Sequence, residues 1–452
     1  MSVVNIIGGG LAGSECALYL SKRGIKVRLF EMRPKKMTPV HQTELFSELV
    51  CSNSLKSEMI ENASGMLKNE LMLLKSNLLK IAYHSRVNAG KALAVDRNIF
   101  SQTVTQAVEE KVEVVRKEIH DIREFDLEKE YVVVATGPLT SESLMASLFS
   151  FLETEELYFF DAVSPIIDSE DIDREIVFSG DRYDQFDENN QPKAGAYLNC
   201  PMDKITYQTF REKLIQAEVL PVKDFERKHL FERCQPIEEI ARSGIDAMRF
   251  GPLKPVGLFD PRTCKEPYAV VQLRKENNSG SMYNLVGFQT RLKWAEQKKI
   301  IHMIPGLEHV DVLRYGVMHK NAYINSPLLL QDDFSSKKAS KIYFAGQLTG
   351  VEGYVESIAS GYFVAMNIYR KIAGLEKINF PLETMIGSLF FYCTHAEDLK
   401  PMYANFGLLP DLAMRVPKKK RRAEKSIRGL NAINDFIEKN KQELSNDKKD
   451  DI

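Results

Sequence analysis

The sequence lacks the patterns that are typical of membrane proteins, secreted proteins and disulfide-rich or zinc-binding proteins. No run approaches the ~18 apolar residues that a membrane span requires, and the apolar start is broken by glycines without a preceding basic residue, unlike a secretory signal. No C-x-x-C pair occurs among the six cysteines, so neither a disulfide scaffold nor a zinc site is indicated. We therefore expect reduced thiols and a cytoplasmic protein without a membrane partner.

The chain also lacks an excess of charge of either sign. Its 61 lysines and arginines balance 62 acidic residues, so a nucleic acid could be held only by a local basic patch. The composition, 44% hydrophobic and 27% charged, is typical of globular proteins. A single core rarely grows past ~250–300 residues. We therefore expect 452 residues to form two or three domains.

A glycine-rich turn near the N-terminus lies between an apolar β-branched run and a helical pattern. The segment VVNIIGGGLAGSECALYLSKRGIKVRLFE reads as strand, turn, helix and strand. Gly8, Gly10 and Gly13 match G-x-G-x-x-G, and Glu31 ends the second strand. The glycines permit a tight turn, close approach of a pyrophosphate and close helix packing, and the carboxylate accepts from ribose hydroxyls. This spacing predicts a dinucleotide site.

Two later segments favour FAD over NAD as the dinucleotide. VVVATGP at 132–138 reads as a strand beside the first site, and IYFAGQLTGVEGY at 342–354 reads as a strand followed by a glycine turn. A helix starting near Gly353 would place a positive N-terminus beside the pyrimidine ring of a flavin, which stabilises the anionic reduced form. The alternative is that 342–369 is a purely structural strand and helix.

The texture of the sequence changes between about 178 and 282, where polar loops and Pro and Gly punctuation interrupt short helices. We expect an α/β protein, with a Rossmann-type FAD-binding domain built on a doubly wound parallel sheet and an inserted α+β domain. The expected limits are 1–177 and 301–440 for the FAD-binding domain, the latter part with C-terminal helices, 178–300 for the insertion, and 441–452 for a disordered tail.

Two cysteines have polar neighbours, which sets them apart from the others. A lone cysteine is most often a small buried hydrophobe, and we interpret three in this way: Cys16, Cys264 and Cys393. For Cys200, in YLNCPM, packing and function are equally open. Cys51 lies in LVCSNSLKS close to Lys56, and Cys234 precedes a helix started by proline. A helix N-terminus or a nearby cation favours a nucleophilic thiolate, so both are candidates for catalysis, with a packing role as the alternative.

The chain resembles the folate- and FAD-dependent tRNA uracil-5-methyltransferases, the TrmFO family, within the wider family of GidA-like flavoproteins. The matching segments follow the family's order through most of the chain. They are GGGLAGSECALYL, RLFEMRP, TPVHQTELFSELVCSNSLKS, ALAVDRNIFS, YLNCPMDK, CQPIEEIARSGIDAMRFGPLKPVGL, NLVGFQTRLKWAEQKKIIHMIPGLEHVDVLRYGVMHKN, AGQLTGVEGYVESIASG and NFGLLP.

The resemblance implies where FAD binds and which thiols react. The implied cofactor residues are Gly8, Gly9, Gly10, Leu11, Ala12, Gly13, Glu31, Arg33, Gly137, Gly346, Gln347, Gly350, Val351, Glu352, Gly353 and Tyr354. Cys51 and Cys234 correspond to the functional pair, and we assign the attack on the uracil to Cys234, with Cys51 as its partner near the flavin. Arg249 and Lys254 match family positions and would line the folate or base pocket, or else pair within the insertion.

The implied reaction methylates carbon 5 of uridine-54 in the T-loop of tRNA. Methylenetetrahydrofolate supplies the carbon, reduced FAD carries it and donates hydride, and NADH or NADPH reduces the flavin. The base must leave its stack to be reached. Two basic groups could contact phosphates or be solvated and structural instead: Lys418, Lys419, Lys420, Arg421 and Arg422, and Arg291, Lys293, Lys298 and Lys299.

Three alternatives remain open at the level of sequence. The same chemistry could act on a uridine of 23S ribosomal RNA. A flavin oxidoreductase of a small molecule would need the dinucleotide motifs but would leave the cysteine loops without a task. A flavoprotein that only binds RNA or a protein partner would need no reactive thiol. The oligomeric state is not indicated by any pattern.

Overall fold

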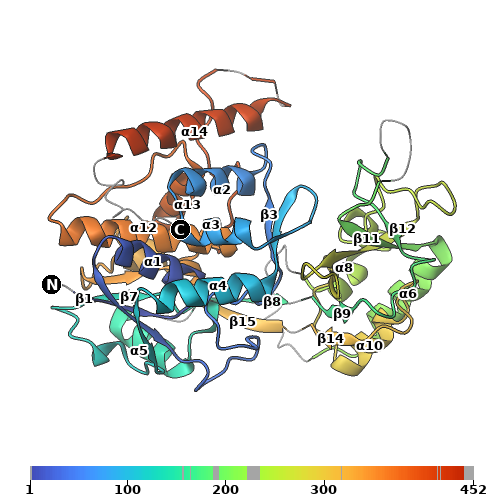
Figure 1. The fold of residues 1–452 in the computed structure, drawn as a ribbon, viewed down its shortest axis with the longest axis horizontal. Helices are drawn as coiled ribbons and strands as arrows, with labels where there is room; N and C mark the ends of the chain where they lie inside the picture. Colours follow the sequence, from blue (N-terminus) through green and yellow to red (C-terminus); the bar gives the residue numbers. More distant parts are fainter. Residues whose placement is uncertain are drawn as a thin grey trace.

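The computed structural model describes residues 3–154, 157–162, 164–186, 193–220, 235–316, 318–414, 416–417 and 419–441. Figure 1 shows two separate sheets, one under the N- and C-terminal helices and one formed by the middle of the chain. Within these ranges, no helix combines the length and the apolar character needed to span a bilayer.

The first sheet is parallel throughout and has five strands in the order β16-β7-β1-β2-β6. Every residue of β7 is buried, as expected for a parallel strand covered on both faces. The strands are β1 (Val3–Ile7), β2 (Lys26–Glu31), β6 (Glu113–Arg116), β7 (Tyr131–Val134) and β16 (Ile342–Phe344). Since β16 comes from the far end of the chain, it confirms that the nucleotide-binding fold closes there.

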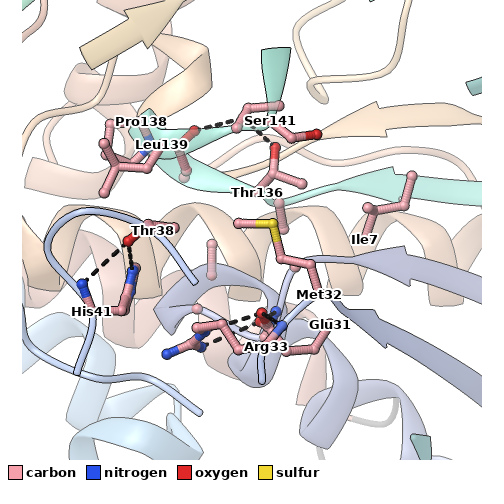
Figure 2. A pocket seen from close by; sticks show the side chains of 18 of the residues that line it. Ile7, Glu31, Met32, Arg33, Thr38, His41, Thr136, Pro138, Leu139 and Ser141 are labelled. Atoms are coloured by element: carbon pink, nitrogen blue, oxygen red, sulfur yellow. Dashed lines mark hydrogen bonds and ion pairs between the residues drawn. The ribbon is translucent and has the colours of Figure 1, made fainter. Parts of the chain in front are cut away.

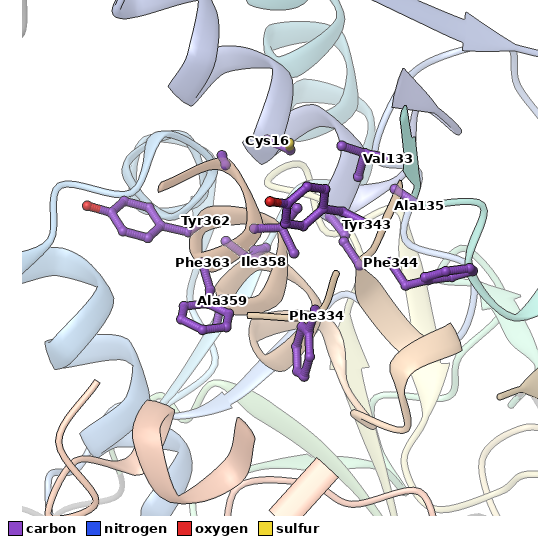
Figure 3. Close-up of a cluster of buried hydrophobic side chains, with 14 of the residues drawn as sticks. Cys16, Val133, Ala135, Phe334, Tyr343, Phe344, Ile358, Ala359, Tyr362 and Phe363 are labelled. Atoms are coloured by element: carbon purple, nitrogen blue, oxygen red, sulfur yellow. The ribbon is translucent and has the colours of Figure 1, made fainter. Parts of the chain in front are cut away.

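Two helices pack against each other beside this sheet and fix its glycine turn. They are α1 (Leu11–Lys22) and α12 (Tyr354–Ile372), and α12 begins after Gly353 as expected. A side chain at Gly361 would lie 2.2 Å from the carbonyl oxygen of Ala12, so only glycine allows this approach. Figure 3 shows the shared core, in which Cys16 lies among Tyr343, Phe344 and other apolar groups. Cys16 and Cys393 are buried, which confirms their predicted packing role.

The second sheet is antiparallel and has six strands in the order β10-β11-β12-β13-β9-β14. Together with its helices α6 (Lys204–Gln216), α8 (Ile237–Ser243), α9 (Ala247–Phe250) and α10 (Trp294–Ile301), it has the expected α+β character. Its strands are β9 (Ile166–Asp168), β10 (Phe178–Ser179), β11 (Tyr197–Met202), β12 (Ala269–Lys275), β13 (Met282–Leu285) and β14 (Val312–Arg314). The expected limits of 178 and 300 are therefore too narrow for this sheet, because β9 and β14 pair across a long stretch of sequence.

The chain passes between the sheets through one antiparallel pair, β8 (Leu157–Ala162) and β15 (Met318–Tyr323). Figure 1 shows this pair between the two parts. A small sheet in the order β3-β5-β4 joins β3 (Ser54–Ser57), β4 (Arg86–Val87) and β5 (Ala92–Val95). The other helices are α2 (Ala63–Leu73), α3 (Asn77–His84), α4 (Arg97–Glu109), α5 (Glu142–Leu152), α11 (Ser326–Leu329), α13 (Met385–His395) and α14 (Arg421–Lys439).

Two buried glutamate carboxyl groups accept hydrogen bonds from the first turns of helices that are distant in sequence. Glu15 accepts from the backbone N–H groups of Asn77 (3.0 Å) and Leu78 (2.7 Å) at the start of α3. Glu70 accepts from those of Met385 (2.7 Å) and Ile386 (3.0 Å) at the start of α13. Each carboxyl group thereby satisfies N–H groups that have no partner within their own helix.

Replacing Glu70 with alanine should lower the free energy of unfolding by about 3 kcal/mol, because two buried N–H donors lose their acceptor. Burial raises the pKa of Glu70 to about 8, against the opposing effect of the two hydrogen bonds. Chemical denaturation measures the loss. Glu424→Ala, at an exposed position on α14, is the matched control and should change stability little. Equal effects of the two substitutions would contradict this role.

Candidate functional site

A cleft opens at the carboxyl ends of β1, β2 and β7, which is where open parallel sheets bind ligands. Figure 2 shows Glu31 and Arg33 on one side of it and the segment from Thr136 to Ser141 on the other. Of the expected cofactor residues, those that line it are Gly8, Gly9, Gly10, Leu11, Ala12, Glu31, Arg33, Gly137, Gly346, Gln347 and Tyr354. Residues from the N-terminal part of the chain and residues near 350 thus line the same cleft.

The remaining expected cofactor residues do not line the cleft. A side chain at Gly13 would lie 1.9 Å from the carbonyl oxygen of Gly8, so this glycine serves the packing of α1 on the turn. Gly350 ends a short 3₁₀ turn (Gly346–Thr349) with φ 90°, and Val351 is buried. Glu352 accepts a hydrogen bond from Gln347, and Gly353 precedes α12. These residues shape the backbone that carries Gly346, Gln347 and Tyr354.

The glycine turn suits a pyrophosphate because it leaves open space at its centre. A side chain at Gly10 would meet no atom within 4 Å. Gly10 is also the N-cap residue of α1, and no side chain caps that helix end. The N–H groups at the start of α1 and the positive end of its dipole therefore face the cleft at Gly10, where no side chain covers the backbone. Together with the acidic residue described next, these features fit a dinucleotide such as FAD.

Glu31 is held as a carboxylate by four N–H donors. The backbone N–H groups of Gly9 (2.9 Å) and Arg33 (3.0 Å) donate to it, and the Arg33 guanidinium donates through Nε (3.0 Å) and Nη2 (3.3 Å). Burial favours the neutral acid, but the Arg33 guanidinium and these hydrogen bonds prevail and hold the pKa of Glu31 below its usual range. An ionised acceptor therefore stands at the rim of the glycine turn, where ribose hydroxyls would donate to it.

Sequence reasoning missed several residues that line the cleft, among them His41. Thr38 Oγ1 lies 2.6 Å from its Nδ1. Burial, followed by the nearby Arg33 guanidinium, lowers the pKa of His41 to about 4, so the imidazole is neutral at physiological pH. The segment TPVHQTELFSELVCSNSLKS already contained this residue, but no spacing marked it as part of a site.

The loop that carries Cys51 is tied to the first turn of α12. Tyr354 Oη accepts from the backbone N–H groups of Cys51 (2.7 Å) and Ser52 (3.1 Å). Tyr354 and the neighbouring Val50 both line the dinucleotide cleft. The half-buried Cys51 therefore lies beside that cleft.

The same loop is also fastened to the second sheet. Arg274 on β12 donates to Asn53 Oδ1 (2.8 Å) and Ser52 Oγ (2.7 Å). Arg97 donates to the carbonyl oxygen of Leu49 (2.6 Å) and forms an ion pair at 2.6 Å with Glu276, which follows β12. The loop around Cys51 thus takes its hydrogen-bond partners from both sheets.

Positive charge surrounds this loop. Electrostatic interactions with Cys51 act on both Arg97 and Arg314, so the two guanidinium groups lie close enough to attract a thiolate. Burial raises the pKa of Tyr354, and the electrostatic interaction with Cys51 acts in the same direction, so the phenol stays protonated. Arg97 belongs to the segment ALAVDRNIFS, yet nothing in its local pattern indicates this contact.

Cys234, the other expected thiol, lies outside the described residues, so its distance from Cys51 stays a prediction. The helix that follows it, α8, starts after Pro236 as expected. Cys200 is fully buried on β11, which fits packing. Cys264 is exposed in a turn with φ 55°, so its predicted burial was wrong. Its polar neighbours in DPRTCKEP were the signal that could have shown this.

Most of the remaining basic candidates form hydrogen bonds or ion pairs within the protein. Arg249 donates to the carbonyl oxygen of Tyr268 (2.8 Å) and to Asp246 (2.9 Å), and Arg291 is buried against Glu238 and Glu239. Lys293 and Lys299 pair with acidic neighbours, whereas Lys254 and Lys298 are exposed. Lys418 lies outside the described residues. The rest of its run is exposed at the start of α14: Lys419, Lys420, Arg421 and Arg422.

A buried lysine supports the strand that follows the Cys51 loop. Lys68 on α2 is fully buried and donates to the carbonyl oxygen of Leu55 (2.7 Å). Burial lowers the pKa of Lys68 to about 8, Glu356 opposes this effect, and Lys56 adds to it. The folded protein thus releases this proton near pH 8, whereas the unfolded chain keeps it to ~10.5.

Stability should therefore rise with pH between about 8 and 10.5 through this one group, because the unfolded chain binds the proton more tightly in that range. The expected gain is about 3 kcal/mol. Denaturant titrations of the wild type and of Lys68→Met at pH 7.5 and pH 10 measure it as the difference in pH dependence. Lys80→Met, at an exposed site on α3, is the control. Identical pH profiles for wild type and Lys68→Met would contradict the assignment.

Comparisons with known proteins agree with this geometry. The family model "Glucose inhibited division protein A" (GIDA) matches residues 3–376. The methylenetetrahydrofolate–tRNA-(uracil-5-)-methyltransferase TrmFO of Thermotoga maritima is 56% identical over 443 residues, covering 97% of this chain and 99% of the relative. That of Thermotoga petrophila is 57% identical over 441 residues, covering 96% and 99%.

Among solved structures, GidA of Aquifex aeolicus aligns with a TM-score of 0.70 at 18% identity, covering 98% of this chain and 76% of that one. At this identity the likeness concerns the fold, and it confirms the Rossmann-type FAD-binding architecture predicted from the sequence. The family match and the full-length relatives reach further than the fold. The chain therefore belongs to the GidA family and, within it, to the TrmFO family.

Proposed function

We propose that this protein is an FAD-dependent enzyme that transfers a one-carbon unit from methylenetetrahydrofolate to carbon 5 of a uracil in tRNA. Its full-length relatives bear the name of this reaction. One structural observation carries the proposal: the peptide N–H of Cys51 is bound by Tyr354, a residue that lines the dinucleotide cleft. A thiol fixed beside this cleft lies where methylation of a uracil at carbon 5 requires a reactive cysteine.

In this proposal the two ends of the chain hold the cofactor. Gly10 and the start of α1 bind the pyrophosphate, Glu31 binds a ribose, and Gly346 and Gln347 lie on the flavin side with the start of α12. When bound, FAD carries the carbon unit and supplies the hydride that completes the methyl group. The open space at Gly10 and the ionised Glu31 support this placement.

The thiols prepare the uracil. Carbon 5 becomes nucleophilic once a thiolate adds to carbon 6. After the carbon unit is attached, removal of the carbon-5 proton, with Cys51 as the base, expels the thiolate from carbon 6 and restores the ring. We assign the addition to Cys234 and a position beside the flavin to Cys51, whose neighbours Arg97 and Arg314 attract an anionic sulfur. The target base has to leave its stack, and we propose uridine-54 of the T-loop. The protein would work in the cytoplasm, where its thiols stay reduced.

Transfer of labelled carbon tests this function. The purified protein with FAD, NADH or NADPH and [¹⁴C]methylenetetrahydrofolate should place label in a tRNA transcript, and nuclease mapping should find it at position 54. A transcript with cytidine at that position and a fragment of 23S ribosomal RNA are the controls. Label found only in the ribosomal fragment would change the substrate. Label taken from S-adenosylmethionine, or oxidation of NADPH that is indifferent to folate and RNA, would overturn the proposal.

A further inference from the structure

A second cleft lies at strand β3, which follows the Cys51 loop in the chain. It forms where β3, the start of α2, the segment 403–407 and the start of α14 meet. Polar, cationic and aromatic side chains line it, including Lys56, Ser57, Asn62, Tyr403, Phe406 and Arg422. None of them lines the dinucleotide cleft. Among the residues that the structure describes, no carboxylate lines the second cleft.

Helix α14 forms one wall, and its position is fixed by contacts to both neighbours. Figure 1 shows it lying over α2. Ser426 Oγ donates to the carbonyl oxygen of Ile60 (2.6 Å), and Lys425 Nζ donates to that of Leu409 (3.0 Å). Arg422 lies one turn before Ser426 and so shares its helix face. This places an exposed guanidinium at the mouth of the cleft.

Lys56 on β3 contributes the second cation that lines the cleft. Its backbone has φ 66°, a left-handed conformation that is costly for a residue with a side chain and is often kept where function requires it. Its Nζ lies 3.2 Å from the buried carboxylate of Glu356 and 5.7 Å from the ring centre of Tyr403. These contacts aim the ammonium group, and the side chain stays 43% exposed.

We propose that this cleft binds a phosphate of the RNA backbone and thereby holds the strand beside Cys51. Two cations that line one cleft together with amide and hydroxyl groups match the oxygens of a phosphate. Tyr403 and Phe406 offer faces to a ribose or a base. Cys51 and Lys56 are bound to the same turn of α12, through Tyr354 and Glu356. A phosphate bound by Lys56 would therefore have a fixed position relative to the Cys51 thiol. The inference rests on the proposed function.

Salt-dependent binding of a tRNA transcript, measured without turnover, tests the cleft. Arg422→Gln should weaken binding about fivefold to tenfold near 0.1 M salt. It should also reduce the slope of log K against log salt by ~0.7–0.9, the value for one phosphate. Arg421→Gln removes the same charge from the adjacent residue, which does not line the cleft, and should change affinity less than about twofold. Equal effects of the two substitutions, or no effect of either, would overturn the proposal.

Two further measurements distinguish failure of the phosphate assignment from failure of the proposed function. If Arg422→Gln raises the KM for methylenetetrahydrofolate and leaves tRNA affinity intact, the cleft binds the carboxylates of folate, and the phosphate assignment is wrong. If the wild type binds tRNA in the expected way but never methylates it, the proposed function fails, whereas the binding site stands. Thermal melting of both variants should match the wild type, since both positions are exposed.

Discussion

Replacement of Cys51 by alanine is expected to lower kcat for tRNA methylation at least about a thousandfold, whereas FAD still binds. The sulfur lies beside the cleft, and its peptide N–H keeps the bond to Tyr354 after the substitution because that bond belongs to the backbone. Loss of the thiol thus removes chemistry without removing the loop's anchor. Single-turnover transfer of label from methylenetetrahydrofolate measures the rate, and the flavin absorbance of the purified variant measures cofactor content.

Cys264→Ala is the matched control, because it removes an exposed thiol that lies in a turn of its own. It should leave the rate within about twofold of the wild type. A Cys51→Ala enzyme that keeps more than about a tenth of the wild-type rate would show that the sulfur is not needed. A variant that loses FAD together with activity would instead assign Cys51 a role in holding the cofactor.

Gly10→Ala should weaken FAD binding about a hundredfold, or by about 2.7 kcal/mol, with little change in the stability of the protein without FAD. The added methyl group meets no protein atom within 4 Å, so the folded chain accepts it. Only a ligand that approaches the backbone at this point would be displaced. FAD titration followed by fluorescence gives the affinity, and the loss of helix capping should stay below about 1 kcal/mol.

Gly13→Ala is the contrasting substitution, because its methyl group would lie 1.9 Å from the carbonyl oxygen of Gly8. It should destabilise the protein by more than about 3 kcal/mol even without FAD, because backbone has to move. The pair separates a ligand-binding glycine from a packing glycine of the same motif. If Gly10→Ala binds FAD normally, the pyrophosphate does not lie at this turn and the cofactor assignment fails.

The first sheet and its cleft could be predicted because their signals are local. Gly8, Gly10 and Gly13 follow one strand and begin one helix, so their spacing alone predicts the strand–turn–helix geometry of a dinucleotide site. The same holds for the start of α12 after Gly353, where a glycine turn precedes a run with helical period. A few residues in sequence decide the backbone at each of these places.

The anchoring of the Cys51 loop could not be predicted in this way. Tyr354 and Cys51 are 303 residues apart, and Arg274 reaches Asn53 over 221. Such contacts depend on how the two sheets meet, and no periodic pattern encodes them. The buried Lys68 presented the same difficulty, because its charge suggests an exposed helix face until the partner Leu55 is known.

The fastening of one loop to both sheets has a mechanical consequence. Arg97 and Glu276, and Arg274 with Ser52 and Asn53, form a joint across the seam between the two halves of the molecule. A rotation of one half against the other would strain the hydrogen bonds of Arg97 and Arg274. The orientation of the Cys51 sulfur therefore depends on the relative orientation of the two halves. A ligand that bridges the two halves is therefore expected to change the position of the Cys51 sulfur without contacting it.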